Sequence, residues 1–242
     1  MTRLVRTAVL LPLIALTITA CAVRLGGPSP EEYDVAAVFE LRDADADAVA
    51  ARLRDIGAEI VLMAAERQDS AWFNYVGHTA GLVVSGPGAT TGRGYAFMTT
   101  PALEILGDTT LVLPVQGGGS VHMHDALYRI DEYRNIDLMI VRLEGPDLRI
   151  TVRTLLNYIA TDVPADAPLL LALDGPTAAI ADSAATMIRA TIGDASECRE
   201  DEQAAAPAVR LLYGPSARVA CLSARNLTGV TTGIVARLEV GR

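Results

Sequence analysis

The stretch that decides the fold is VAAVFELRDADADAVAARLRDIGAEIVLMAA, residues 35 to 65. Its first seven residues form an apolar run that is typical of a buried strand. Three aspartates then alternate with small residues, and acidic side chains favour the N-cap and first turn of a helix. Gly57 is a suitable helix C-cap, and the apolar run from Glu59 to Ala65 follows it. The stretch therefore predicts a strand, a helix and a second strand.

The C-terminal third shows the same order of elements, with a strand from Leu169 to Leu173 and then a helix beginning near Asp174. The middle of the chain reads as strands, because apolar and polar residues alternate through it. The stretch from Leu148 to Thr154 is predicted to pair with the strand before it as a hairpin, and Ala71 to Val76 is predicted to be a short strand. We therefore expect an α+β fold, which is a β-rich domain with two helices, β-α-β-β units at each end and antiparallel hairpins between them.

The N-terminus has the features of an export signal. Arg3 and Arg6 precede an apolar stretch from Ala8 to Ile18, which is shorter than the roughly 20 residues that span a bilayer as a helix. The residues Ile18-Thr19-Ala20-Cys21 then resemble the lipobox of bacterial lipoproteins. An ordinary secretory signal followed by a chance cysteine is the alternative.

The lipoprotein resemblance implies that Cys21 carries acyl chains such as palmitate and that residues 1–20 are removed. Residues 21–33, rich in glycine and proline, are expected to form a lipidated tether, and residues 34–242 a periplasmic α+β domain. Ala22 follows the cysteine, and by the rule of that family the protein is sorted to the outer membrane, facing the periplasm. The membrane is then a partner through the N-terminal lipid.

The chain is acidic, with a formal net charge of −9 from 29 acidic and 20 basic residues, and every basic residue is arginine. Nucleic acid is therefore not expected as a partner, since its binding requires clustered cations. The absence of lysine excludes lysine Schiff-base chemistry and Walker-type phosphate binding.

Two cysteines remain once Cys21 is assigned to the lipid. Cys198 and Cys221 are an even pair in a compartment that is oxidising, so we predict a disulfide between them. A redox or metal pair is the alternative, but the two cysteines lack C-x-x-C spacing.

Two histidines are the most specific candidates for a metal site. His122 and His124 lie two residues apart, so on a strand their imidazoles share one face, and His78 is the third imidazole of the chain. Asp125 is expected on the opposite face. Histidines on an exposed strand face explain the same pattern without a metal.

Two further features have a functional and a structural interpretation. Asp174 ends a predicted strand, where α/β proteins often place catalytic groups, but it is also a plausible helix N-cap. Arg129, Tyr133 and Arg134 lie in a stretch dense in paired charges, which could be a partner-facing surface or a solvated polar face.

The sequence contains no motif strong enough to name a reaction, and no cofactor is expected. We therefore expect a membrane-anchored envelope lipoprotein that acts as a non-enzymatic accessory, assembly or binding protein, possible partners being other envelope proteins. The alternative is a metal-binding protein or metal-dependent envelope enzyme that uses His122 and His124.

Overall fold

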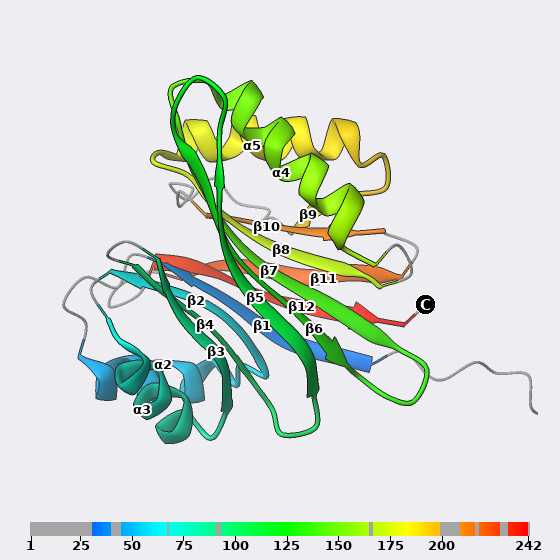
Figure 1. The fold of residues 1–242 in the computed structure, drawn as a ribbon. Helices are drawn as coiled ribbons and strands as arrows, with labels where there is room; N and C mark the ends of the chain where they lie inside the picture. The colour runs from blue at the N-terminus through cyan, green and yellow to red at the C-terminus, as the bar shows by residue number, and fades with distance from the viewer. Residues whose placement is uncertain are drawn as a thin grey trace, which may run out of the picture. The chain divides into compact units, whose positions relative to one another are not determined.

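The computed structural model describes residues 31–39, 45–66, 68–90, 93–164, 167–198, 209–215, 218–227 and 232–241 (Figure 1). The chain divides into two units, residues 1–30 and residues 31–242. The predicted signal, Cys21 and most of the predicted tether lie outside the described residues. Residues 31–33 do not belong to a tether, because the first strand already begins at Glu31.

The first sheet has six strands in the order β11-β12-β1-β2-β4-β3. β1 and β2 are parallel, as the strand-helix-strand pattern predicts, and the other neighbours are antiparallel. The strands are β1 (Glu31–Phe39), β2 (Ile60–Glu66), β3 (Val83–Thr90), β4 (Arg93–Thr99), β11 (Val219–Leu227) and β12 (Thr232–Val240).

The second sheet also has six strands, in the order β5-β6-β7-β8-β10-β9. Its one parallel pair among the described strands is β7 with β8. The strands are β5 (Glu104–Pro114), β6 (Ser120–Arg129), β7 (Asn135–Glu144), β8 (Leu169–Asp174), β9 (Ser196–Cys198) and β10 (Val209–Gly214).

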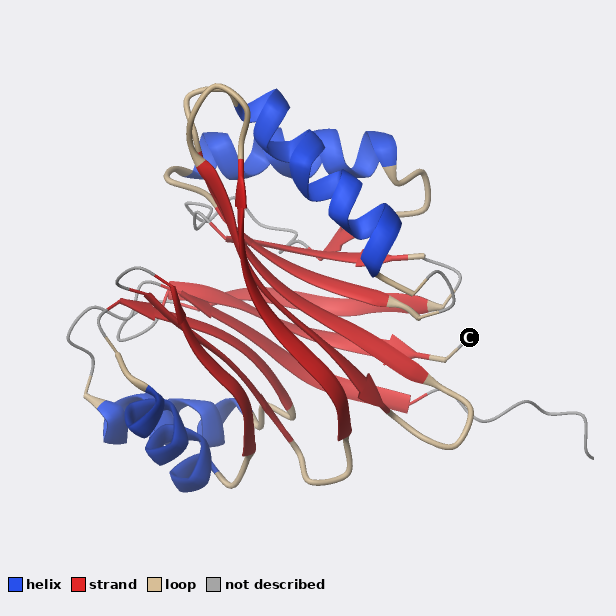
Figure 2. Cartoon of the chain, viewed as in Figure 1, coloured by secondary structure: helices blue, strands red, loops and turns tan. Residues whose placement is uncertain are grey.

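Four helices are described, and each begins at a side chain that accepts a backbone N–H bond. They are α2 (Ala46–Ile56), α3 (Ser70–Ala80), α4 (Leu148–Asp162) and α5 (Ala178–Thr191), with N-caps Asp45, Asp69, Asp147 and Thr177. Figure 2 shows that these helices lie on the two outer faces of the paired sheets. None of the described helices is long and apolar enough to cross a membrane.

Three apolar layers hold residues 31–242 together. The inner faces of both sheets meet in a core that includes Phe39, Phe97 and Leu138. The outer faces pack separately against α2 with α3 and against α4 with α5. Both sheets, all three layers and the disulfide described below lie within residues 31–242, so this unit has what it needs to fold on its own.

The predicted α+β, β-rich class is confirmed, but the expectation of only two helices is wrong. Residues 71–76 lie in α3 and residues 148–154 lie in α4, where strands were predicted. In both cases the aspartate before the segment caps a helix: Asp69 accepts from the amide of Trp72, and Asp147 from the amides of Arg149 and Ile150. These caps favour helical structure where the apolar alternation alone indicates a strand.

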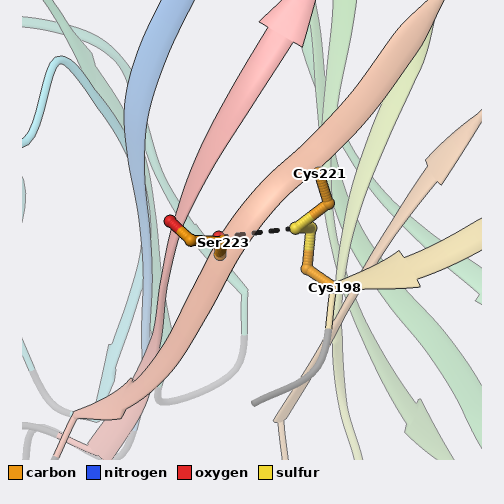
Figure 3. The surroundings of a disulfide bond; sticks show 3 residues. All are labelled: Cys198, Cys221 and Ser223. Carbon is orange, nitrogen blue, oxygen red and sulfur yellow. Dashed lines mark hydrogen bonds between the residues drawn. A yellow bond between two sulfur atoms is a disulfide. The ribbon is translucent and has the colours of Figure 1, made fainter. Parts of the chain in front are cut away.

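The predicted pairing of Cys198 with Cys221 is present, and it joins the two sheets (Figure 3). Cys198 ends β9 in the second sheet, and Cys221 lies in β11 of the first, with the two Cα atoms 5.7 Å apart. The Sγ of Cys221 lies 3.5 Å from the carbonyl oxygen of Ser223. The bond therefore fixes one edge of the sandwich across its inner layer.

Candidate active site

The two parallel strand pairs end on the same side of the domain. Ser85 of β3 meets the hydroxyl of Tyr128, while the next residue, Gly86, lies against His124. β3 therefore runs antiparallel to β6 across the inner layer, and it follows from the pairings within each sheet that β2 runs parallel to β7. The carboxyl ends of β1, β2, β7 and β8 thus lie at one edge, which is where open parallel sheets bind their ligands.

The last residues of β7 and β8 form a chain of charged groups at this edge. Nη1 of Arg142 lies 2.9 Å from Oδ2 of Asp174, and Nε of Arg142 lies 2.7 Å from Oε1 of Glu144. Asp174 is only 1% exposed. Asp174 and Arg142 are also neighbours in register across the two parallel strands. One guanidinium thus holds a buried carboxylate and a carboxylate nearer the solvent.

Strand alternation explains why these groups face the inner layer. The odd-numbered residues Val141 and Leu143 pack under the helices, so Arg142 and Glu144 point toward the other sheet. Glu66 ends β2 at the same edge, and its alternate neighbours Leu62 and Ala64 belong to the inner core. The edge therefore collects carboxylates from both sheets.

His122 extends the charged chain onto β6. Its Nε2 lies 2.7 Å from Oγ of Ser120 and 3.5 Å from Oε2 of Glu144. An imidazole in this position can exchange a proton with groups at the edge. Glu144 therefore connects His122 to the Arg142–Asp174 pair.

His124 shares a face with His122, as the spacing predicts, but it lies deeper between the sheets. It stacks on Phe97 with ring centres 4.7 Å apart, and its Nδ1 lies 2.7 Å from Oγ1 of Thr110. Burial lowers the pKa of His124 to about 4, although the negative charges of Asp108 and Asp125 and a hydrogen bond to the backbone of Thr109 act in the opposite direction. His124 is therefore a neutral core residue at pH 7.

The three candidate histidines do not converge on one metal site. His122 is directed to Ser120 and Glu144, His124 to Thr110 and Phe97, and His78 lies in the last turn of α3. Within the part of the chain that the structure describes, no three side chains among histidine, cysteine, aspartate and glutamate are grouped so as to hold a metal ion.

Asp125 lies on the opposite face from the histidines, as alternation predicts, and belongs to a buried acidic pair. Its Oδ2 accepts a hydrogen bond from the hydroxyl of Tyr158 in α4. Asp137 adjoins it, and burial, together with the hydrogen bond and negative charge of Asp125, raises the pKa of Asp137 to about 9. At pH 7 Asp137 therefore keeps its proton beneath α4, away from the carboxyl ends of the strands.

Asp174 is not the helix cap that the sequence suggests. α5 is capped by Thr177, whose side chain accepts from the amide of Ile180, and Asp174 remains the last residue of β8. The structure therefore favours the functional interpretation of this aspartate. Sequence analysis did not identify Arg142 or Glu144, because their role depends on the register of β7 with β8.

In the predicted partner surface, both arginines form ion pairs with carboxylates of the same chain. Arg134 donates to Asp131 and Glu31, and Arg129 donates to Glu104. Tyr133 is 81% exposed at the turn between β6 and β7. Both arginines therefore have partners within the chain, and Tyr133 is the most exposed of the three residues.

The sequence matches no known protein-family model, and no curated protein is significantly similar to it. Solved structures do match. An endonuclease/exonuclease/phosphatase family protein from Bacteroides thetaiotaomicron aligns with a TM-score of 0.68 at 10% identity, covering 88% of this chain and 99% of its own. D. rerio TDP2 complexed with single strand DNA product aligns with a TM-score of 0.60 at 12% identity, covering 86% and 99%.

A third match is a Cimex nitrophorin in a ferrous NO complex, with a TM-score of 0.56 at 12% identity, covering 88% of this chain and 100% of its own. At these identities the matches show the fold alone. The chain therefore shares its fold with these solved structures.

Two expectations from the sequence are corrected by these matches. A non-enzymatic accessory role conflicts with a fold whose solved examples include endonuclease/exonuclease/phosphatase family proteins, and the metal-dependent alternative agrees better with it. The exclusion of nucleic acid conflicts with the TDP2 match, which is complexed with DNA. Net charge is a weak guide here, because it averages over the whole surface and says little about one edge.

Proposed function

We propose that this protein is a divalent-metal-dependent hydrolase of phosphate esters, acting at the edge where β7 and β8 end. The observation that carries the proposal is the buried Asp174 bound to Arg142, itself bound to Glu144, at the carboxyl ends of parallel strands. The match to endonuclease/exonuclease/phosphatase family proteins supports the same reaction class.

The donor set fits a hard cation such as Mg²⁺. Mg²⁺ in proteins is commonly held by one or two carboxylates, with water and substrate phosphate completing its shell. Asp174 and Glu144 provide two carboxylates joined by one guanidinium. The two carboxylates and the single guanidinium leave a net negative charge, which repels a phosphate unless a further cation is bound. The buried imidazoles, by contrast, do not form such a set.

The residues at this edge would then have separate roles. Asp174 and Glu144 would hold the cation, which supplies a Lewis acid and an acidified water when bound. Arg142, oriented by both carboxylates, would bind a phosphate oxygen through its planar guanidinium. His122, 3.5 Å from Glu144, would take up or release a proton at Nε2 as the ester bond breaks.

Hydrolysis of bis(4-nitrophenyl) phosphate and of a single-stranded oligonucleotide by residues 22–242 tests the proposal. We expect turnover with Mg²⁺ or Mn²⁺, its loss in EDTA, and a decrease of about 100-fold or more in Asp174→Asn. Asp147→Asn is the control, since it removes a nearby charge but keeps a side chain that caps α4. Equal rates for wild type and Asp174→Asn, or no rate above background, would contradict the proposal.

We also propose that Cys21 anchors the domain to the cell envelope through its acyl chains. The lipobox-like residues support this, and the Cys198–Cys221 bond suits an oxidising compartment. A Cys21→Ala protein should fold but be recovered in the soluble periplasmic fraction or remain unprocessed. Membrane attachment that persists after correct cleavage would show that the lipid is not the anchor.

A further inference from the structure

A cavity lies at the other end of β8 from Asp174. It has a volume of about 330 Å³ and lies beneath the last turns of α4 and α5, on the helix-covered face of the second sheet. Its wall includes Leu169, the first residue of β8, five residues and roughly 17 Å from Asp174. The cavity is therefore separate from the proposed active edge.

The wall of this cavity is almost wholly apolar. The principal side chains are Ile159, Val163, Leu169, Ile188, Ile192 and Leu212. Four of them, Ile159, Val163, Leu169 and Ile192, are only partly buried, so the apolar layer under α4 and α5 is open here. Among the described lining residues Asp194 has the only charge. The lining favours an apolar ligand over a polar one.

The cavity lies at the end of the domain where β1 begins. Pro215 lines the cavity, and its carbonyl accepts from the amide of Arg218 at 2.9 Å. The carbonyl of Arg218 accepts from the amide of Gly241, also at 2.9 Å, and the preceding Val240 pairs with Glu31. Figure 1 shows the start of β1 and the end of β12 on this same side.

An exposed aromatic side chain lies at the same end. Tyr133 is 81% exposed, and the adjoining Arg134 donates to Glu31 and to the carbonyl of Val240. Tyrosine is enriched where protein meets the membrane interface, because its ring is apolar and its hydroxyl is polar.

The proposed anchor would hold this end toward the bilayer. Ten residue steps separate Cys21 from Glu31, which is about 35 Å when fully extended and about 17 Å as a flexible chain. A domain so restrained keeps the end that carries the cavity within about 35 Å of the lipidated cysteine, and so close to lipid. An apolar cavity elsewhere on the surface would not be held close to the membrane in this way.

We propose that the cavity binds one acyl chain of a membrane lipid. Its volume lies at the lower end of the range for small-molecule pockets, and its lining matches a linear hydrocarbon. The position near the bilayer depends on the proposed Cys21 anchor, whereas the binding itself depends only on the residues that line the cavity. The inference is independent of hydrolysis at the opposite edge.

Gly193 offers a way to block the cavity without crowding the fold. It lines the cavity and is exposed, and a Cβ there would meet no atom within 4 Å. Gly107 in β5 is equally open but is not among the lining residues, so Gly107→Phe is the matched control for Gly193→Phe.

Fluorescence titration of residues 22–242 with cis-parinaric acid tests binding directly. We expect saturation at one probe per protein, at least tenfold weaker binding in Gly193→Phe, and no change in Gly107→Phe. No saturable binding, or equal affinity in Gly193→Phe and wild type, would overturn the proposal. Gly193→Phe should keep its phosphoesterase activity, so failure here and failure of the proposed function are distinguishable.

The lipid source is tested with the lipidated protein in nanodiscs that contain a phospholipid with a photoreactive acyl chain. We expect crosslinks to peptides that line the cavity, reduced in Gly193→Phe. If crosslinks were found only in the tether, the acyl chain of Cys21 itself would fill the cavity. That result would overturn the assignment to a membrane lipid.

Discussion

Arg142 and Asp174 join the carboxyl ends of two neighbouring parallel strands, with Nη1 2.9 Å from Oδ2 and the carboxylate almost fully buried. Methionine at position 142 keeps the apolar stem but removes the nearest described cation from Asp174. We expect Arg142→Met to lower the free energy of unfolding by about 3 kcal/mol in urea titration. Part of this loss should be recovered in the Arg142→Met/Asp174→Leu double variant.

The matched control is the pair of Arg237 with Asp34, which has two contacts of 3.0 Å but lies at the surface. Arg237→Met should change stability far less than Arg142→Met, because solvent screens the exposed pair. Similar losses in the two variants would show that burial of Asp174 does not govern the strength of its pairing.

The buried Asp125–Asp137 pair predicts that the free energy of unfolding depends on pH above 7. The pKa of Asp137 is about 9 in the folded protein and about 3.9 in an unfolded chain, so the folded state binds more protons between these values. The free energy of unfolding should therefore fall as pH rises from 7 to 9. Asp137→Asn should flatten this slope in urea titrations at both pH values, and an unchanged slope would rule out the buried proton.

Gly86 allows the two sheets to approach beside His124. Its φ is +54°, and a Cβ would overlap Nε2 of His124 and Oδ2 of Asp108. We expect Gly86→Ala to cost about 2 kcal/mol or more in unfolding free energy. Gly107→Ala, at a position with open space and no left-handed backbone, should be nearly neutral. Equal effects would mean that the sheets are not in close contact at Gly86.

The disulfide joins two cysteines that are 23 positions apart in the sequence and lie in different sheets. A Cys198→Ser/Cys221→Ser variant should lose roughly 3 kcal/mol of stability, chiefly because its unfolded chain is less restrained. Thermal unfolding with and without dithiothreitol gives the measurement. The reductant should lower the midpoint of the wild type and leave the double variant unchanged, and an unaffected wild type would show that the bond does not form in solution.

Local signals predicted the fold where they agreed with one another. Around α2 the aspartates, the apolar spacing and Gly57 all indicate a helix, and Asp45 and Gly57 are its caps. At α4, by contrast, Leu148, Ile150 and Val152 alternate like a strand, and only Asp147 indicates a helix start. Tertiary packing under the second sheet decides between these two local interpretations.

The candidate site was harder to predict from the sequence than the fold. Asp174 stood out because it follows an apolar strand, but its partner Arg142 lies 32 residues earlier, and only the register of β7 with β8 brings the two together. The histidine pair had a conspicuous spacing, yet the stacking of His124 on Phe97 uses residues from opposite sheets. Contacts between sheets are not encoded in any local pattern.

The most direct test of the central claim is a Mn²⁺ titration of residues 22–242 followed by electron paramagnetic resonance. The account predicts one saturable Mn²⁺ site that is lost in Asp174→Asn and weakened in Glu144→Gln, while Asp147→Asn binds like the wild type. Mn²⁺ binding that is absent from the wild type, or that survives unchanged in Asp174→Asn, would contradict it.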